Sequence, residues 1–259
     1  IRIPEVIAKA VADQMPALAL TDLANLFGLV KFYQSANKNG VKPILGCDVW
    51  ITNEPNRNKP IRLLLLCQSH AGYLLLSRLL SRAYRENQHH GRAEIREAWL
   101  HPTEWGSQGL IALSGGHLGD IGSAILQNNL QQAEIQTRKW ANLFPDRFYI
   151  EVQRDGHAHE AMLVQQSLIL AQKFDLPVVA TQAVQFLNAD DYRAHEARVC
   201  IAEGYILGDK RRPKSFTEQQ YFKNQAEMAQ LFADIPSALT NTIEIAKRCN
   251  LQLELGKNY

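Results

Sequence analysis

The chain has 259 residues, which is long enough for one α/β barrel domain with a large hydrophobic core. Its 28 lysines and arginines nearly balance 26 aspartates and glutamates, and the net charge of +2 argues against a dedicated nucleic-acid-binding module. No run of 18 apolar residues predicts a membrane span, and the first residues lack the order of a secretory signal. The four cysteines are far apart and form no CxxC pair, so they indicate reduced thiols in a cytoplasmic protein.

Short apolar runs alternate with longer stretches of helical period along most of the chain. Helices are expected at residues 4–14, 25–39, 69–86, 119–128, 130–143, 159–174 and 189–203. Strands are expected at residues 17–21, 43–51, 61–67, 109–114, 147–152 and 177–181. This alternation predicts an α/β fold built from parallel βαβ units.

The last part of the chain has a different pattern. Residues 205–216 are expected to form a loop, and two helices without a strand between them are expected at residues 225–233 and 235–249. The loop carries a basic cluster, Lys210, Arg211, Arg212 and Lys214. A solvated loop is favoured over a phosphate contact, because one short run gives no extended patch. We therefore predict a barrel domain over residues 1–204 and a loop and helical extension over residues 205–259.

Acidic residues stand at the predicted strand ends, where α/β barrels place their active sites. Asp22, Asp48 and Asp155 are the candidates, with His195 nearby at best. A hydrolytic metal site needs at least three N, O or S ligands for each ion. Three carboxylates without histidine suit Mg²⁺ better than a catalytic zinc or manganese cluster. The neighbour of the first candidate, Leu23, cannot ligate a metal.

Two further polar segments have competing interpretations. Residues 155–160, DGHAHE, hold the densest histidine and carboxylate cluster, and His157 with His159 could clip a metal. A polar turn that starts a helix is favoured there, because residues i and i+2 diverge on a helix. Residues 114–120, SGGHLGD, could offer backbone N–H groups to a phosphate, but a tight strand-to-helix turn needs the same glycines.

Seven segments in order along the chain resemble a known family. They are ALALTDLANLFGLVKFY, VKPILGCDVWI, HAGYLLLSRLLSRAY, LIALSGGHLGDIG, FPDRFYIEVQRDG, LPVVATQAVQFL and LFADIPSALTNTIEIAKRCN. They are similar to the N-terminal polymerase-and-histidinol-phosphatase (PHP) domain of bacterial DNA polymerase III alpha subunits. The resemblance covers essentially the whole chain and implies a distorted seven-stranded (β/α) barrel with a metal cleft at one rim. It also implies that the closing helices lead toward the polymerase palm, and that the family's first histidine motif lies upstream of Ile1.

Several positions depart from the metal-binding pattern of that family. Leu23 stands where the pattern has His, Gly116 where it has Cys, and Asp155 where it has His. Ala183 and Gln185 replace an Asp-x-His pair. These substitutions remove coordination bonds, and Leu23 adds apolar bulk where an ion would need polar ligands.

Two positions keep a residue that can bind metal. Asp48 replaces a Glu and can still ligate, and His195 matches a histidine that is common in the family. The pattern as a whole therefore predicts a vestigial cleft with no bound metal, no cofactor and no catalytic residue.

The resemblance implies a role within a larger protein. The parent would be a DNA-directed DNA polymerase, a nucleotidyltransferase of DNA replication that uses Mg²⁺ and contacts DNA. This domain would be a non-catalytic scaffold that docks the proofreading exonuclease subunit and other replicase subunits. The alternative is an active metal-dependent phosphoesterase or 3′–5′ exonuclease or pyrophosphatase, using the four candidate residues and upstream histidines. A nucleic-acid-binding module is the third, disfavoured interpretation because of the near-neutral charge.

Overall fold

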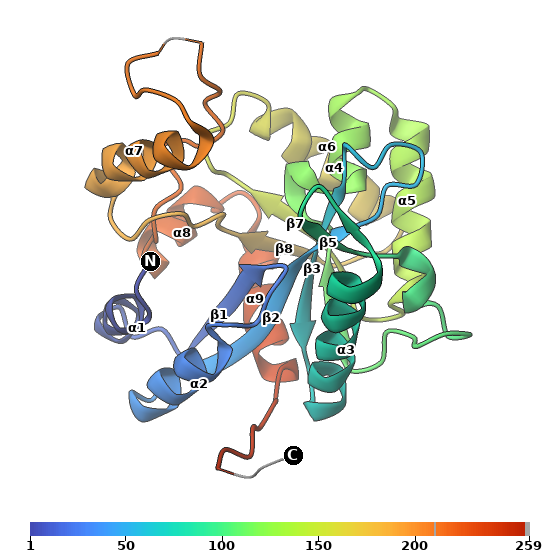
Figure 1. Cartoon of the computed structure of the whole chain (residues 1–259), viewed down its shortest axis with the longest axis horizontal. Helices are drawn as coiled ribbons and strands as arrows, with labels where there is room; N and C mark the ends of the chain where they lie inside the picture. The colour runs from blue at the N-terminus through green and yellow to red at the C-terminus, as the bar shows by residue number, and fades with distance from the viewer. Residues whose placement is uncertain (210, 257–259) are drawn as a thin grey trace.

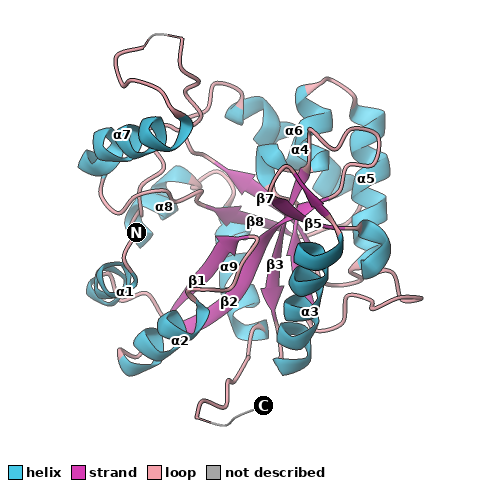
Figure 2. Cartoon of the chain, viewed as in Figure 1, coloured by secondary structure: helices cyan, strands magenta, loops and turns pink. Residues whose placement is uncertain are grey.

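The structure, a computed structural model, describes residues 1–209 and 211–256, so Lys210 of the basic cluster lies outside the described residues. It is an α/β fold in which helices surround a twisted sheet (Figures 1 and 2). The strands are β1 (Ala17–Leu23), β2 (Lys42–Ile51), β3 (Ile61–Cys67), β4 (Gln88–His89), β5 (Arg92–Ile95), β6 (Leu110–Leu113), β7 (Phe148–Gln153) and β8 (Val178–Thr181). This α/β class confirms the prediction.

The strand order is β4-β5-β2-β3-β6-β7-β8, and β1 pairs with the first part of β2. In the described part of the chain the sheet has eight strands, whereas the resemblance implied seven and the sequence pattern predicted six. The two strands that the pattern did not predict form the short hairpin of β4 and β5. Within the described residues no strand pairing joins β8 to β1, so hydrogen bonds do not close the barrel there.

The prediction of purely parallel βαβ units is wrong for one strand. β3 runs antiparallel to both β2 and β6, whereas β1–β2, β6–β7 and β7–β8 are parallel. Residues 52–60 between β2 and β3 contain no helix, and a parallel crossover needs a connection of a dozen residues or more. The short loop therefore turns the chain back on itself.

The predicted helices are confirmed, with ends that differ by a few residues. They are α1 (Ile3–Ala12), α2 (Leu29–Lys38), α3 (His70–Glu86), α4 (Asp120–Leu126), α5 (Leu130–Leu143), α6 (Glu160–Lys173), α7 (Tyr192–Glu203), α8 (Gln225–Leu231) and α9 (Pro236–Arg248). The largest difference is at α2, which begins at Leu29 because residues 24–28 form turns and irregular loop, and Ala24 has a positive φ of 55°. No helix in the described ranges combines the length and the apolarity that crossing a membrane requires.

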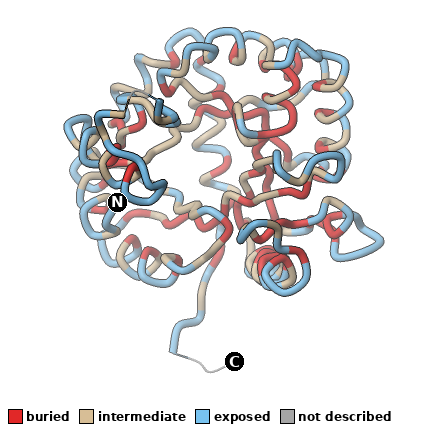
Figure 3. The backbone as a smooth tube through the Cα atoms, turned by 45° about the horizontal axis from the view of Figure 1, so that its top comes forward, coloured by how far each residue is buried: buried red, intermediate tan, exposed pale blue. Residues whose placement is uncertain are grey.

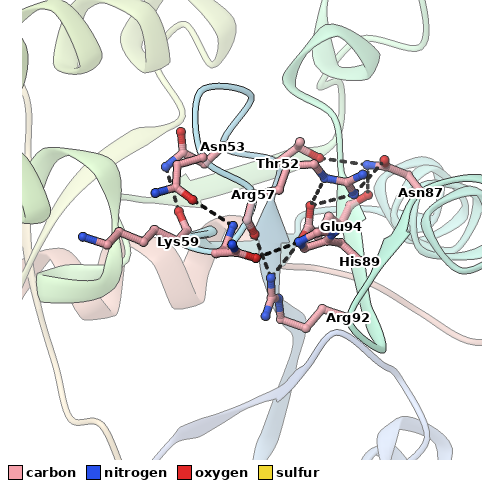
Figure 4. Close-up of polar contacts among 10 residues, drawn as sticks. Thr52, Asn53, Arg57, Lys59, Asn87, His89, Arg92 and Glu94 are labelled. Carbon is pink, nitrogen blue, oxygen red and sulfur yellow. Dashed lines mark hydrogen bonds and ion pairs between the residues drawn. The ribbon is translucent and has the colours of Figure 1, made fainter.

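A polar network holds the loop between β2 and β3 against the β4–β5 hairpin (Figure 4). The fully buried carboxylate of Glu94 accepts hydrogen bonds from Arg57, at 3.0 and 3.2 Å, and from Arg92 at 3.4 Å. Asn87 accepts a hydrogen bond from Arg57 at 3.1 Å and donates one to the hydroxyl of Thr52 at 2.8 Å. A buried charge needs such partners, so this network fixes the loop in place.

The two faces of the sheet pack against different elements. The outer face carries the main core, in which residues such as Leu45, Leu65 and Ile150 pack with α1–α6. Buried segments, drawn in red in Figure 3, lie mainly in the interior of the molecule. We call the opposite face the inner face. Its lower half, toward the N-terminal ends of β2, β7 and β8, is apolar and packs against Ile245 and Cys249 at the end of α9. The apolar strand residues of this half are Ile44, Leu66, Ile111, Leu113, Tyr149 and Val179.

Helix α9 is tied to the sheet by hydrogen bonds as well as by packing. Asn241 donates a hydrogen bond to the carbonyl of Val178 in β8 at 2.7 Å, and Lys42 of β2 donates one to the carbonyl of Ala246 at 2.6 Å. The extension at residues 205–259 thus contributes directly to the second core. The division of the chain at residue 204 stays a prediction.

Candidate functional site

The upper half of the inner face is polar. Side chains alternate between the faces of a strand, so the apolar positions Ile44, Leu66, Tyr149 and Val179 set the face of polar residues two or four positions away. These polar residues form a group that we call the inner-face cluster. Its members are Asp48, Arg62, Glu151, Gln153 and Thr181.

Arg62 and Asp48 form an ion pair within this cluster. Nε of Arg62 donates to one carboxylate oxygen of Asp48 at 2.8 Å, and a terminal guanidinium nitrogen donates to the other oxygen. The guanidinium also lies over the ring of Trp50, 4.7 Å from its centroid. Burial raises the pKa of Asp48, and the hydrogen bonds and charge of Arg62 lower it only in part.

Glu151 occupies the centre of β7 and is almost completely buried. Its carboxylate accepts hydrogen bonds from the hydroxyl of Thr181, from Nε2 of Gln153 at 3.1 Å, and from the backbone N–H of Gly115 at 3.0 Å. Burial raises the pKa of Glu151 to about 7, and the nearby charge of Asp48 raises it further against the effect of these hydrogen bonds. A buried carboxyl group with a strongly raised pKa is a candidate functional group.

The predicted site residues lie in different places. β1 and β2 pair so that Leu23 is opposite Asp48, which puts the leucine on the inner face. Asp22 points the other way, and its Oδ2 lies 3.0 Å from where a Cβ on Gly28 would be, at the start of α2. The structure therefore does not bring Asp22 into the cluster with Asp48, because neighbouring strand residues face opposite sides.

His195 is also separate from the carboxylates. It lies on α7 among aromatic rings, 5.4 Å from the ring centroid of Phe186 and 4.6 Å from that of Phe216. Burial lowers its pKa, and the charge of Arg198 lowers it further. This is the environment of a packed core histidine.

Two of the remaining positions of the pattern have side chains without a ligand atom, since Ala183 and Gly116 carry no polar side chain. The backbone N–H of Gln185 donates to the carbonyl of Gln220 at 2.8 Å. Gly116 has a positive φ of 56°, and a Cβ there would lie 2.6 Å from Oε1 of Gln153. The absence of a side chain at Gly116 therefore leaves room for the amide of Gln153, which donates a hydrogen bond to Glu151.

Asp155 belongs to a second group, at the ends of β6 and β7, which we call the rim cluster. It consists of His117, Asp155 and His157, and one ligand atom from each lies within 4.8 Å of the others. His117 follows β6 and His157 follows β7, and the two strands are parallel neighbours, so their carboxyl ends meet. The favoured polar turn is confirmed, since α6 begins at Glu160, but the turn also carries His157 to this cluster.

Sequence reasoning missed Arg62, Glu151 and His117. The signal for the first two was present as strand alternation, because IRLLLLC and FYIEVQ each place a charged residue in step with apolar inner-face positions. The contribution of His117 depends on the pairing of β6 with β7, which the local pattern does not reveal.

The basic cluster was interpreted as a solvated loop. Arg211 fits that prediction, with 89% of its side chain exposed and an ion pair to Asp209 at 3.0 Å. Arg212 does not fit it, because its side chain is 10% exposed and pairs with the buried Glu196 of α7. The local sequence could not show this partner, which lies 16 residues earlier on another element.

The sequence model of the PHP domain matches residues 1–155, which is more than half of the chain. The chain therefore belongs to the PHP domain family.

The chain is also similar to alpha subunits of bacterial DNA polymerase III. The chain is 48% identical to the DNA polymerase III subunit alpha of Neisseria meningitidis serogroup A over all of its length. It is 44% identical to the subunit of Pseudomonas aeruginosa and 40% identical to that of Escherichia coli K12, each over 98% of the chain. The chain spans 21–23% of the length of these three relatives.

Two solved structures are more distant. One is a putative metal-dependent phosphoesterase from Bifidobacterium adolescentis, with a TM-score of 0.42 and 11% identity, covering 69% of this chain and 81% of that one. The other is an amidohydrolase from Chromobacterium violaceum, with a TM-score of 0.41 and 15% identity, covering 70% and 81%.

Proposed function

We propose that this chain is the PHP domain of a DNA polymerase III alpha subunit, and that it acts there as a non-catalytic scaffold. Its similarity to three such subunits over 98–100% of its length supports the first part. The parent protein would carry out DNA-directed DNA synthesis with Mg²⁺ in the cytoplasm. The four free, buried cysteines are in keeping with a reducing compartment.

The hydrogen bonds within the inner-face cluster support the second part of the proposal, the non-catalytic role. Both carboxylate oxygens of Asp48 accept hydrogen bonds from Arg62, so a guanidinium holds the position next to Asp48 that a metal ion would need. The carboxylate of Glu151 is likewise used by three donors. With the apolar Leu23 beside Asp48, this donor set does not fit the metal cluster that the family's hydrolytic members require.

A scaffold role needs a rigid domain and partners that bind to its surface. The two cores on opposite faces of the sheet supply rigidity. The proposed partners are the proofreading exonuclease subunit and other replicase subunits, with DNA contacted through the parent protein. Co-elution of the full-length protein with the exonuclease subunit in size-exclusion chromatography would support the docking role, and separate elution at micromolar concentrations would contradict it.

The decisive experiment compares hydrolysis with and without Asp48. The full-length protein, with all sequence before Ile1 retained, is assayed on p-nitrophenyl phosphate and on a 3′-recessed DNA in Mn²⁺, Zn²⁺ and Mg²⁺. We expect no hydrolysis that depends on Asp48. Hydrolysis that Asp48→Ala abolishes would instead establish a metal-dependent phosphoesterase or exonuclease.

A further inference from the structure

The rim cluster lies outside the inner-face cluster and has no part in the scaffold role. We propose that His117, Asp155 and His157 bind one divalent transition-metal ion, with Zn²⁺ as the best match. This site would coexist with a non-catalytic inner face. It would link the turn between β6 and α4 to the turn between β7 and α6.

The spacing of the three side chains is close to that of a metal site. In a tetrahedral zinc site with bonds of about 2.1 Å, neighbouring ligand atoms are about 3.4 Å apart. Nε2 of His157 and Oδ2 of Asp155 are 3.7 Å apart. All three ligand atoms lie within 4.8 Å of one another, and small rotations of the two half-buried imidazoles would bring them to an ion.

Asp155 provides an independent indication that a cation belongs here. Its side chain is 3% exposed, and Oδ2 is buried without a hydrogen-bond partner. A buried carboxylate oxygen without a donor loses its hydration and gains nothing in return. The nearby ammonium of Lys223 donates instead to the carbonyl of Gln219. A metal ion between Asp155 and the two histidines would satisfy this oxygen.

The donor set selects the class of metal. Two imidazoles and one carboxylate suit zinc and related transition metals, whereas Mg²⁺ and Ca²⁺ prefer oxygen ligands alone. Burial lowers the pKa of His117, and this direction favours the neutral imidazole that a metal ion binds. Three protein ligands leave a fourth position for water or another small ligand.

The proposed site differs from the expectation of no bound metal, which came from counting ligands in the family's pattern. Of its three members, only Asp155 stands at a position where that pattern has a ligand. The two histidines stand at positions that the pattern does not use, one residue after Gly116 and two residues after Asp155. The inference is therefore one about this chain's own residues.

The test measures metal content and affinity, with no assay of hydrolysis. The full-length protein is freed of metal with a chelator, then titrated with Zn²⁺ in equilibrium dialysis with elemental analysis. Wild type is compared with His117→Ala, His157→Ala and Asp155→Asn, and with His159→Ala as the matched control. His159 is an exposed histidine of the same turn that lies outside the three-residue group.

We expect wild type to hold one more equivalent of Zn²⁺ than each of the three ligand variants. Each ligand variant should bind that ion on the order of tenfold more weakly or worse, since even changes behind a ligand cost 10–100-fold. His159→Ala should stay within about threefold of wild type. Co²⁺ at the same site should give a visible absorption band that is lost in His157→Ala.

Two outcomes would overturn the proposal. One is equal Zn²⁺ content in wild type and in the three ligand variants. The other is a loss in His159→Ala as large as that in His157→Ala, which would place the ion between His157 and His159. Circular dichroism of His157→Ala, whose changed side chain is half-buried, separates loss of a ligand from loss of the fold. Zinc binding without hydrolysis would leave the scaffold role intact, so the two proposals fail separately.

Discussion

Replacing Glu151 with glutamine should make the fold more stable at alkaline pH than at acid pH, relative to wild type. The carboxyl group of Glu151 has its pKa raised from 4.5 to about 7 in the folded chain, mainly by burial. A group whose pKa is raised by folding contributes fully to stability below its unfolded pKa and loses that contribution as pH rises through the folded value. Wild type therefore loses stability between pH 4.5 and pH 8 from this group.

The size of the effect follows from the two pKa values. At pH 8 the raised pKa of Glu151 destabilises the fold by about 3 kcal/mol, and at pH 5, where the folded carboxyl group is protonated, by about 1 kcal/mol. Glutamine does not titrate, and its amide can donate to the hydroxyl of Thr181 while its oxygen accepts from the N–H of Gly115. The stability of Glu151→Gln relative to wild type should thus rise by about 2 kcal/mol from pH 5 to pH 8.

Urea unfolding followed by circular dichroism at pH 5, 6.5 and 8 measures this difference. Glu203→Gln, a change at an exposed glutamate of α7, is the control and should give the same relative stability at each pH. A relative stability of Glu151→Gln that is constant or falls toward pH 8 would refute the reasoning, because it would mean that Glu151 is already ionised at low pH.

Three further substitutions test how the residues around the buried carboxylates and Gln153 contribute to the stability of the fold. Arg62→Leu should destabilise the fold by about 1–4 kcal/mol, and more at pH 8 than at pH 5, because burial already raises the pKa of Asp48 and the loss of the guanidinium raises it further. In urea unfolding, equal losses at both pH values would contradict this. Gly116→Ala should lower the free energy of unfolding by about 1–3 kcal/mol, and by more than Gly40→Ala. Both glycines have a positive φ, but only Gly116 has atoms close to where a Cβ would lie. Equal shifts in Tm for the two variants would contradict this reasoning. Arg57→Ala should cost about 3 kcal/mol by leaving the buried carboxylate of the loop network short of donors, and a Tm like that of wild type would contradict that role (Figure 4).

The sequence predicted the elements well because their periodicity is local. The strand at β3 and the helix at α5 begin and end at the predicted residues, since a run of Leu and a capping Asn129 mark them clearly. The direction of β3 was missed because it depends on the loop before it and on tertiary pairing. The hairpin of β4 and β5 was missed because two- and four-residue strands carry too little pattern.

The site was harder to predict than the fold. Asp48 was identified from its place in a strand, but its partner Arg62 is on the neighbouring antiparallel strand, and the register of that pair is not visible in either segment alone. Asp22 shows the limit of counting acidic residues at strand ends, because one position decides which face a side chain occupies. His117 and Asp155 are 38 positions apart and meet only through the pairing of β6 with β7.

The seat of α9 on the inner face has a consequence for how the domain unfolds. Residues 1–155, which the family has in common, would by themselves leave a row of large apolar strand residues facing water, and that exposed row would favour aggregation. The sheet and the helix that arrives about eighty residues later should therefore melt in a single cooperative step. Force applied to the chain just after α9 would act first on the strands β2, β7 and β8, to which hydrogen bonds join this helix. Helix α9 therefore couples the mechanical stability of the C-terminal segment to that of strands formed by the N-terminal half.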